Sequence, residues 1–211
     1  MIVETFPVGM LQCNCTILGD PASGEAIVID GGDDVDAIVR RLNAHGLRAT
    51  YLVHTHAHID HIGALGPLRE RAGGAGLLHP ADLPLYGTLA EQALWLGLVT
   101  PPEVVALDGE LADGEVLRAG ALALRCIHTP GHTPGSTSFA LERDGRTVLY
   151  TGDTLFAGSV GRWDLGGTSL EDIVRSIRGK LLDHDDASVV VPGHGPLTTI
   201  GTERRTNPYL A

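Results

Sequence analysis

Short runs of aliphatic and β-branched residues alternate with stretches of helical periodicity along the whole chain. Strands are predicted at 2–6, 13–18, 26–29, 50–54, 76–78, 116–117, 122–127, 137–141, 147–150 and 188–191. Helices are predicted at 35–46, 81–96, 168–182 and 202–207. Thr168 is the expected N-cap of the third helix, because Glu171 follows three residues later. Clustered strands with interleaved helices predict an α/β (α+β) fold with mixed sheets.

Length and composition narrow the classes of protein to which the chain can belong. With 211 residues and 43% hydrophobic residues, we expect a single domain over residues 1–211. The net charge of −11 and the absence of a Lys/Arg run argue against nucleic-acid binding. No apolar stretch reaches 18 residues and the N-terminus lacks a basic segment, so we expect neither a membrane span nor a signal peptide.

The three cysteines give an expectation about the compartment. Cys13 and Cys15 are too close in sequence for a comfortable disulfide, and Cys126 leaves the count odd. A reducing, cytoplasmic location is therefore expected. We expect Cys13 and Cys15 to pack as small buried side chains on one strand, with metal ligation by the cysteines as the alternative.

A six-residue stretch after the strand-like run 51–53 carries the most distinctive chemistry. It contains His56, His58, Asp60 and His61, whose imidazole nitrogens and carboxylate oxygens are ligands that Zn²⁺ prefers. In an extended segment the first three side chains would share one face, whereas His61 would need a turn to reach a second ion. The spacing predicts a metal site.

Three further ligand-type residues follow the same design. His132, Asp153 and His194 each lie in a turn rich in Gly, Pro or Thr, close behind a β-rich run. A rigid strand that positions a loop is the usual way to build an open active site. We therefore expect these residues to join the metal site.

The order of these motifs resembles the metallo-β-lactamase-fold hydrolases, specifically the short, bacterial-type members of the glyoxalase II (hydroxyacylglutathione hydrolase) branch. The resemblance implies a four-layer αβ/βα sandwich with mixed sheets flanked by helices. It also implies two divalent metal ions, with Zn²⁺ as the first expectation and Fe or Mn as alternatives. By position, the first ion would be held by His56, His58 and His132, the second by Asp60, His61 and His194, and both by Asp153.

The same resemblance implies hydrolysis of small thioesters, with S-D-lactoylglutathione as the first candidate. A hydroxide that bridges two cations would attack the carbonyl carbon, and Asp60 would orient or deprotonate the attacking water. Asp30, at the end of a predicted strand, is expected to support the ligands rather than bind metal itself. Arg162 and Arg205 are the candidate cations for substrate carboxylates, with pairing to Asp164 as the alternative for Arg162.

Other activities remain open at this level. A persulfide dioxygenase-like oxidoreductase with a single iron shares the fold, and the ligand types alone do not exclude it. A nuclease of the same superfamily is disfavoured by the acidic net charge. A true β-lactamase is disfavoured because a bridging Asp153 is not the pattern of its common di-zinc forms. We expect a small-molecule substrate as the partner, and the sequence leaves the oligomeric state unknown.

Overall fold

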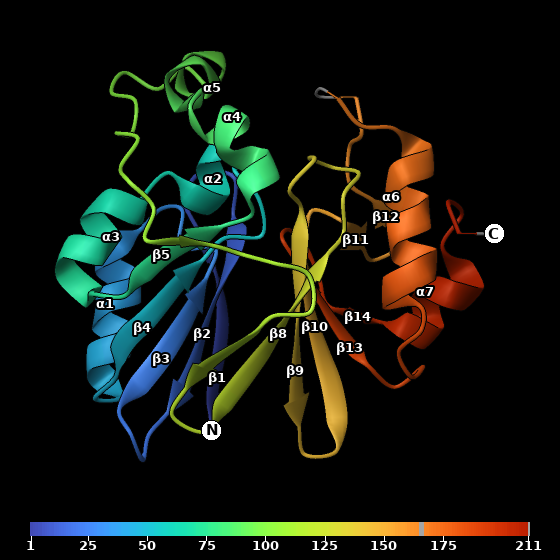
Figure 1. The fold of residues 1–211 in the computed structure, drawn as a ribbon, viewed down its shortest axis with the longest axis horizontal. Helices are drawn as coiled ribbons and strands as arrows, with labels where there is room; N and C mark the ends of the chain where they lie inside the picture. The colour runs from blue at the N-terminus through green and yellow to red at the C-terminus, as the bar shows by residue number, and fades with distance from the viewer. Residues whose placement is uncertain (165–166, 211) are drawn as a thin grey trace. The chain divides into compact units, whose positions relative to one another are not determined.

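The structure is a computed structural model that describes residues 1–164 and 167–210. The chain divides into two compact units. The N-terminal unit comprises Met1–Glu110 and Arg118–Leu122, and the C-terminal unit comprises Leu111–Leu117 and Ala123–Ala211. Each unit has a sheet flanked by helices, as the sequence predicted (Figure 1). The expected single domain over residues 1–211 stays a prediction.

The N-terminal unit is built on a six-stranded mixed sheet of order β1-β2-β3-β4-β5-β6. Its strands are β1 (Ile2–Val8), β2 (Cys13–Asp20), β3 (Glu25–Ile29), β4 (Arg48–Val53), β5 (Ala75–Leu78) and β6 (Gly109–Glu110). The first three strands pair antiparallel, whereas β3 to β6 run parallel. The carboxyl ends of these parallel strands therefore meet at one edge of the sheet, where loops can converge.

The apolar periodicity of the sequence predicted only some of the helices that cover this sheet. Helix α1 (Val35–Ala44) is confirmed, and it buries Ile38 and Leu42 in the core of the unit. In Figure 1, α1 lies beside α3 (Leu65–Ala72), which the sequence had not indicated. The helix predicted over 81–96 is instead three short pieces, η1 (Pro80–Asp82), α4 (Leu83–Tyr86) and α5 (Leu89–Trp95). Pro84 in the first turn of α4 and Gly87 at its end account for the interruption.

A second six-stranded sheet, of order β14-β13-β10-β9-β8-β7, belongs to the C-terminal unit except for Arg118–Ala119 and Leu122, which are assigned to the N-terminal unit. Its strands are β7 (Val116–Ala119), β8 (Leu122–His128), β9 (Thr137–Arg143), β10 (Arg146–Gly152), β13 (Val189–Pro192) and β14 (Thr198–Thr199). Strands β10 and β13 are parallel, and β9 runs antiparallel to both β8 and β10. The carboxyl ends of β8, β10 and β13 therefore lie at the same edge of this sheet.

Helix α6 (Leu170–Ser176) continues into a single π-helical turn, η2 (Ile177–Leu181), and α7 (Ile200–Thr206) follows the last strand. The N-cap of α6 is Ser169 rather than the predicted Thr168. Ser169 Oγ accepts a hydrogen bond from the Asp172 backbone N–H at 3.1 Å, whereas the Thr168 hydroxyl donates to the Trp163 carbonyl. Apolar side chains of α6, η2 and α7 pack on the sheet to form the core of this unit.

Three short strands of the C-terminal unit were not predicted: β14, and the two-stranded hairpin of β11 (Leu155–Phe156) and β12 (Ser159–Val160). Within residues 1–164 and 167–210, no helix is long and apolar enough to cross a membrane.

Candidate metal centre

The predicted ligands of the N-terminal unit lie at the carboxyl edge of its parallel strands. Asp30 follows β3, and the segment that begins at His54 follows β4. The chain bends at Thr55 and His56, however, and only His58 has an extended backbone conformation. Asp60 and His61 belong to a short helix, α2 (Ile59–Ile62), so the predicted alternation of three ligands along a strand is wrong. The helix supplies the change of direction that His61 was expected to need.

Asp30 holds this segment in place by hydrogen bonds. Its backbone is in the left-handed region, with φ of 54°, a conformation that costs free energy for a residue other than glycine. Its buried carboxylate accepts hydrogen bonds from the Thr55 backbone N–H at 2.7 Å and from the Thr55 hydroxyl at 2.8 Å. It also accepts one from His61 Nδ1 at 3.0 Å. These contacts place Asp30 where it can orient His61, and its predicted support of metal ligands stays a prediction.

The hydrogen bonds also fix which nitrogen of each imidazole carries the lone pair. Because the Thr55 hydroxyl donates to Asp30, its oxygen accepts from His56 Nδ1 at 3.0 Å. His61 likewise donates through Nδ1 to Asp30. In both rings Nε2 is therefore the nitrogen suited to bind a cation.

The side chains of this group converge. His56 Nε2 lies 2.9 Å from His58 Nδ1, and the ring centroids of His56 and His61 are 4.0 Å apart. His61 Nε2 lies 3.5 Å from an Asp60 carboxylate oxygen. Ligands on one tetrahedral metal with bonds of about 2.1 Å lie roughly 3.4 Å apart, so the N-terminal group has the donor types and spacings that fit a cation.

Two buried side chains that the sequence did not indicate hold the backbone of this segment. Gln92, on α5, accepts a hydrogen bond from the Ile59 N–H at 2.9 Å and donates to the Ala57 carbonyl at 3.2 Å. Asp82 accepts from the Ala57 N–H at 3.1 Å. The helical fragments after β5 thus serve as a support for the ligand segment. A glutamine on the inner face of a helix was the only available sequence signal for this role.

Cys13 lies beside this group. Its Sγ is 3.5 Å from His61 Nδ1, and burial raises the pKa of the thiol to about 12. Burial also raises the pKa of Cys15 well above its ordinary value. All three cysteines are buried free thiols, which confirms the expected packing of Cys13 and Cys15. Ligand atoms of Cys13, Asp30 and His61 lie within 4.8 Å of one another.

His54 is the first residue of the segment and lies wholly in the interior. Its Nδ1 donates to the His61 carbonyl at 2.9 Å, while Nε2 has no hydrogen-bond partner among the described residues. Burial lowers the pKa of this imidazole to about 4, against a smaller opposing effect of Asp30. His54 is therefore a neutral structural support for His61 at physiological pH.

The predicted ligands of the C-terminal unit are also grouped. Asp153 follows β10 and His194 follows β13, and the Gly193 N–H donates to the Gly152 carbonyl at 2.8 Å where the two strands end. One carboxylate oxygen of Asp153 lies 3.7 Å from His132 Nε2, and the other lies 3.8 Å from His194 Nε2. The Asp153 carboxylate thus presents one oxygen to each of two imidazoles.

The segment that follows the hairpin of β11 and β12 orients His132. His132 Nδ1 donates to the Arg162 carbonyl at 2.7 Å, so Nε2, which faces Asp153, carries the lone pair. Gly161 allows this close approach, because a Cβ at that position would lie 1.7 Å from the Asp153 carbonyl oxygen. Any larger residue would displace the turn that carries Asp153.

The two arginines expected to bind substrate are each paired with a carboxylate of the C-terminal unit. Arg162 makes two 3.0 Å hydrogen bonds to Asp164, as the alternative interpretation predicted. Arg205 lies 3.4 Å from Asp186. Both guanidinium groups are exposed, and a role in substrate binding stays a prediction.

Curated relatives match the chain over its whole length. An uncharacterized protein of Mycobacterium leprae is 42% identical over 219 residues, which cover 100% of this chain and 99% of that protein. The hydroxyacylglutathione hydrolase GloC of Haemophilus influenzae is 36% identical over 214 residues, covering 100% of this chain and 98% of its own length.

Solved structures also match nearly the whole length of this chain. The B3 metallo-beta-lactamase BLEG-1 superposes with a TM-score of 0.86 at 33% identity, covering 99% of each chain. A protein crystallised in a di-iron-bound form gives 0.84 at 36% identity, covering 98% of this chain and 100% of its own. ETHE1 from Myxococcus xanthus gives 0.80 at 27% identity, covering 99% of this chain and 84% of its own.

A family model described as the metallo-beta-lactamase superfamily matches residues 8–194. This span includes all seven predicted ligands, from His56 to His194. Together with the structural matches, it confirms the predicted fold class of mixed sheets flanked by helices. The chain therefore belongs to the metallo-beta-lactamase superfamily.

Proposed function

We propose that the protein is a metal-dependent hydrolase of small thioesters, with S-D-lactoylglutathione as the first candidate substrate. The observation that carries the proposal is the carboxylate of Asp153, which presents one oxygen to His132 and the other to His194. A shared carboxylate of this kind suits a two-metal centre. The 36% identity to a hydroxyacylglutathione hydrolase supports the thioester as substrate.

The proposed ligands are those that the family resemblance implies. His56, His58 and His132 would hold one divalent ion, and Asp60, His61 and His194 would hold the other. Asp153 would contribute to both. We propose Zn²⁺ as the metal, with Fe or Mn as alternatives. The donor types and the spacings within each unit fit such ions.

Two bound cations would supply a nucleophilic hydroxide near neutral pH and polarise the thioester carbonyl. The residues of the chain supply orientation and proton transfer. Asp30, Thr55 and the Arg162 carbonyl hold the imidazoles in the tautomer that directs Nε2 to the ion. Asp60 would accept the proton of the attacking water. A thiol leaving group with a pKa of about 8.5 departs as thiolate without a dedicated acid, which explains why a thioester suits this set of residues.

The proposal also covers substrate-binding residues, cellular location and partners. We propose Arg162 and Arg205 as cations for the carboxylates of the substrate, each after release from its aspartate partner. The three buried free thiols support a reducing, cytoplasmic location. Only a small-molecule substrate is proposed as a partner.

A second candidate is an iron-dependent, persulfide dioxygenase-like oxidoreductase. The structural match to ETHE1 favours this single-iron candidate, and the match to a protein in a di-iron-bound form supports iron as the metal but not the number of ions. The two candidates differ in the number of metal ions, two against one, and in the requirement for oxygen, so one experiment separates them.

The test combines metal analysis with a substrate panel. We expect close to two transition-metal ions per chain after metal-replete expression, and thiol release from S-D-lactoylglutathione without oxygen uptake. Asp153→Ala and His58→Ala should lose metal and turnover together, whereas His45→Ala, on the exposed end of α1, should be silent. Oxygen uptake with glutathione persulfide and no thiol release from any thioester would establish the oxidoreductase instead. A cephalosporin belongs in the panel because BLEG-1 is a B3 metallo-beta-lactamase by its description.

A further inference from the structure

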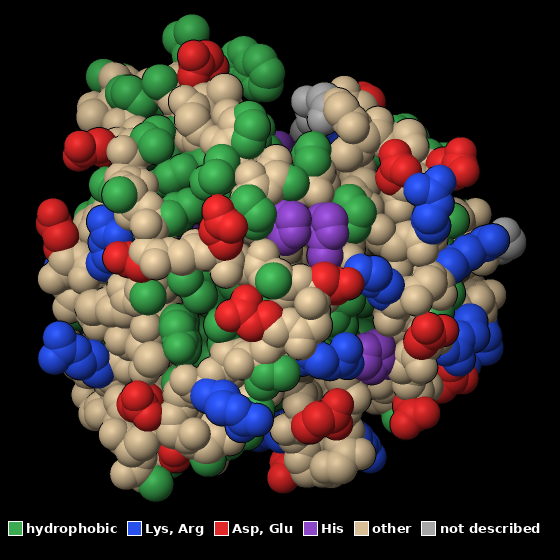
Figure 2. Space-filling view, in the orientation of Figure 1, with side chains coloured by type: hydrophobic (Ala, Val, Ile, Leu, Met, Phe, Trp, Pro, Cys, Tyr) green, Lys and Arg blue, Asp and Glu red, His purple; other side chains and the backbone are tan. Residues whose placement is uncertain are grey.

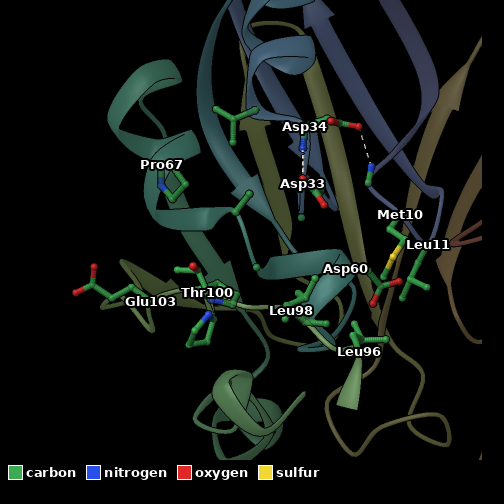
Figure 3. A pocket seen from close by; sticks show the side chains of 18 of the residues that line it. Met10, Leu11, Asp33, Asp34, Asp60, Pro67, Leu96, Leu98, Thr100 and Glu103 are labelled. Carbon is green, nitrogen blue, oxygen red and sulfur yellow. Dashed lines mark hydrogen bonds between the residues drawn. The ribbon is translucent and has the colours of Figure 1, made fainter. Parts of the chain in front are cut away.

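The N-terminal unit contains an open pocket of about 540 Å³ beside the proposed metal ligand Asp60. Its walls come from the turn between β1 and β2, from α2, and from the segment that follows α5. The apolar side chains used in the argument are Met10, Leu11, Leu96 and Leu98. Figure 3 shows the Asp60 carboxylate next to Met10 and Leu11, with Leu96 and Leu98 on its other side.

Three of these apolar side chains are unusually exposed, whereas Leu96 is half-buried and packs against the core of the unit. Met10 is 64% exposed, Leu11 42% and Leu98 40%. The same segment continues into Trp95 at 80% and Val99 at 98%. Figure 2 shows hydrophobic side chains gathered over α5. Hydrated apolar surface of this kind is unfavourable and marks ligand or partner sites when it is contiguous.

The charged residues of the pocket narrow the choice of ligand. Asp33, Asp34 and Glu103 line it together with Asp60, and Figure 3 shows the first two on the same wall. The single cation in the lining is Arg71, and it is paired with Asp36. An anionic ligand group would meet like charge here, so the group that enters the apolar part of the pocket is uncharged.

We propose that this pocket binds the apolar acyl chain of the thioester, so that aliphatic acyl groups of about four to eight carbons are hydrolysed faster than two- and three-carbon ones, including the three-carbon lactoyl group of the first candidate substrate. This inference rests on the proposed thioester hydrolase, because Asp60 links the pocket to the reacting carbonyl. Each methylene that enters an apolar pocket adds about two- to fourfold in affinity for the transition state. The thiol portion of the substrate lies outside the pocket.

An acyl-length series on one uncharged thiol, N-acetylcysteamine, tests the proposal. We expect kcat/KM for thiol release to rise about two- to fourfold per methylene from acetyl to octanoyl. Succinyl, in which a carboxylate replaces the terminal methyl group of butanoyl, should be at least about tenfold slower than butanoyl. A flat series, or succinyl as fast as butanoyl, would overturn the acyl-pocket assignment while leaving the hydrolase in place.

Variants and a binding probe complete the design. Met10→Ser and Leu98→Ser should each lower the ratio of octanoyl to acetyl turnover by about fivefold or more. The matched control is Leu197→Ser, since Leu197 is 56% exposed but lies in the C-terminal unit outside the pocket lining, and its ratio should equal that of the wild type. An equal fall in the Leu197→Ser ratio would overturn the assignment.

A thioether that cannot be hydrolysed, S-octyl-N-acetylcysteamine, separates the pocket from the reaction. Calorimetry should detect binding to the wild type and at least about fivefold weaker binding to Leu98→Ser. If the thioether binds but no thioester is hydrolysed, the result contradicts the proposed function and supports the apolar site. If the protein hydrolyses thioesters but does not bind the thioether, the pocket is not an acyl site. The same conclusion follows if the protein dimerises with increasing concentration and Leu98→Ser abolishes the dimer.

Discussion

At Asp30, one buried carboxylate in a left-handed backbone conformation accepts three hydrogen bonds from Thr55 and His61. The Thr55 hydroxyl that donates to Asp30 also accepts a hydrogen bond from His56. Asp30 therefore orients the imidazoles of both His56 and His61. The conformational strain at Asp30 is compensated by these charge-assisted bonds, each stronger than a neutral hydrogen bond. Single side chains outside the ligand set therefore determine how the ligands point.

His54 gives a residue-scale prediction about pH. Its folded-state pKa, about 4, is below the ordinary value of 6.5, so the unfolded chain binds the proton more readily. The stability that neutral His54 contributes is complete above pH 6.5 and is lost as the pH falls toward 4. The loss amounts to roughly 3 kcal/mol.

The measurement is urea unfolding of the metal-free protein at pH 7.5 and pH 4.5. In the wild type, the free energy of unfolding should fall by roughly 2–3 kcal/mol more than in His54→Asn, which keeps a donor for the His61 carbonyl. If the free energy of unfolding changes equally with pH in the two proteins, protonation of His54 is not the cause of the pH dependence.

At the scale of elements, α5 supports α2 through one side chain. Gln92 both accepts from Ile59 and donates to Ala57, so Gln92→Met removes both bonds at nearly constant volume. We expect metal affinity and kcat to fall about 10- to 100-fold, the usual effect of losing a residue that orients ligands. Metal titration and turnover check this, with far-ultraviolet circular dichroism to verify the fold. Glu91→Gln, an exposed neighbour on α5, is the control, and an equal effect there would contradict the assignment.

Helix α7 is attached to the C-terminal unit by a buried carboxylate. Glu203, 1% exposed, accepts from the Gly158 N–H at 2.9 Å, the Thr198 hydroxyl at 2.6 Å and Asn207 Nδ2 at 2.8 Å. Glu203→Ala leaves three donors without their acceptor, so we expect a loss of roughly 3 kcal/mol, measured by urea unfolding. Glu171→Ala, which breaks the exposed ion pair with Arg175, should cost less than about 1 kcal/mol. Equal losses would refute the anchoring role.

The longer strands and α1 were predictable because each is marked locally, by alternation or by a period of 3.6. The seven ligand positions are marked by chemical motifs, and their role as metal ligands stays a prediction. The breaks at Pro84 and Gly87 were also present in the sequence, but the apolar periodicity of 81–96 concealed them. Helix α2 was not predictable, since its four residues are too few to show a period. The roles of Gln92 and Glu203 depend on partners distant in sequence, which only the folded chain brings into contact.

At the scale of the whole molecule, metal and stability should be coupled. The chain has a net charge of −11, and four predicted ligands belong to the N-terminal unit and three to the C-terminal unit. Ions that bind the folded protein but not the unfolded chain add about 2.7 kcal/mol each at a free concentration 100-fold above the dissociation constant. For a chain of this size, about 1 kcal/mol shifts the melting temperature by roughly 2–4 °C.

We therefore expect chelation to lower the melting temperature by roughly 10–20 °C and added Zn²⁺ to restore it, as followed by calorimetry. If the seven residues serve one pair of ions, His58→Ala in the N-terminal unit and His194→Ala in the C-terminal unit should each lose a large part of the metal-dependent shift. Asp153→Ala, which removes the proposed shared ligand, should lose more than either. His45→Ala should keep the whole shift, because His45 contacts Glu4 rather than any predicted ligand. A full shift in Asp153→Ala would mean that the stabilising ions are bound without the carboxylate on which the two-metal proposal depends.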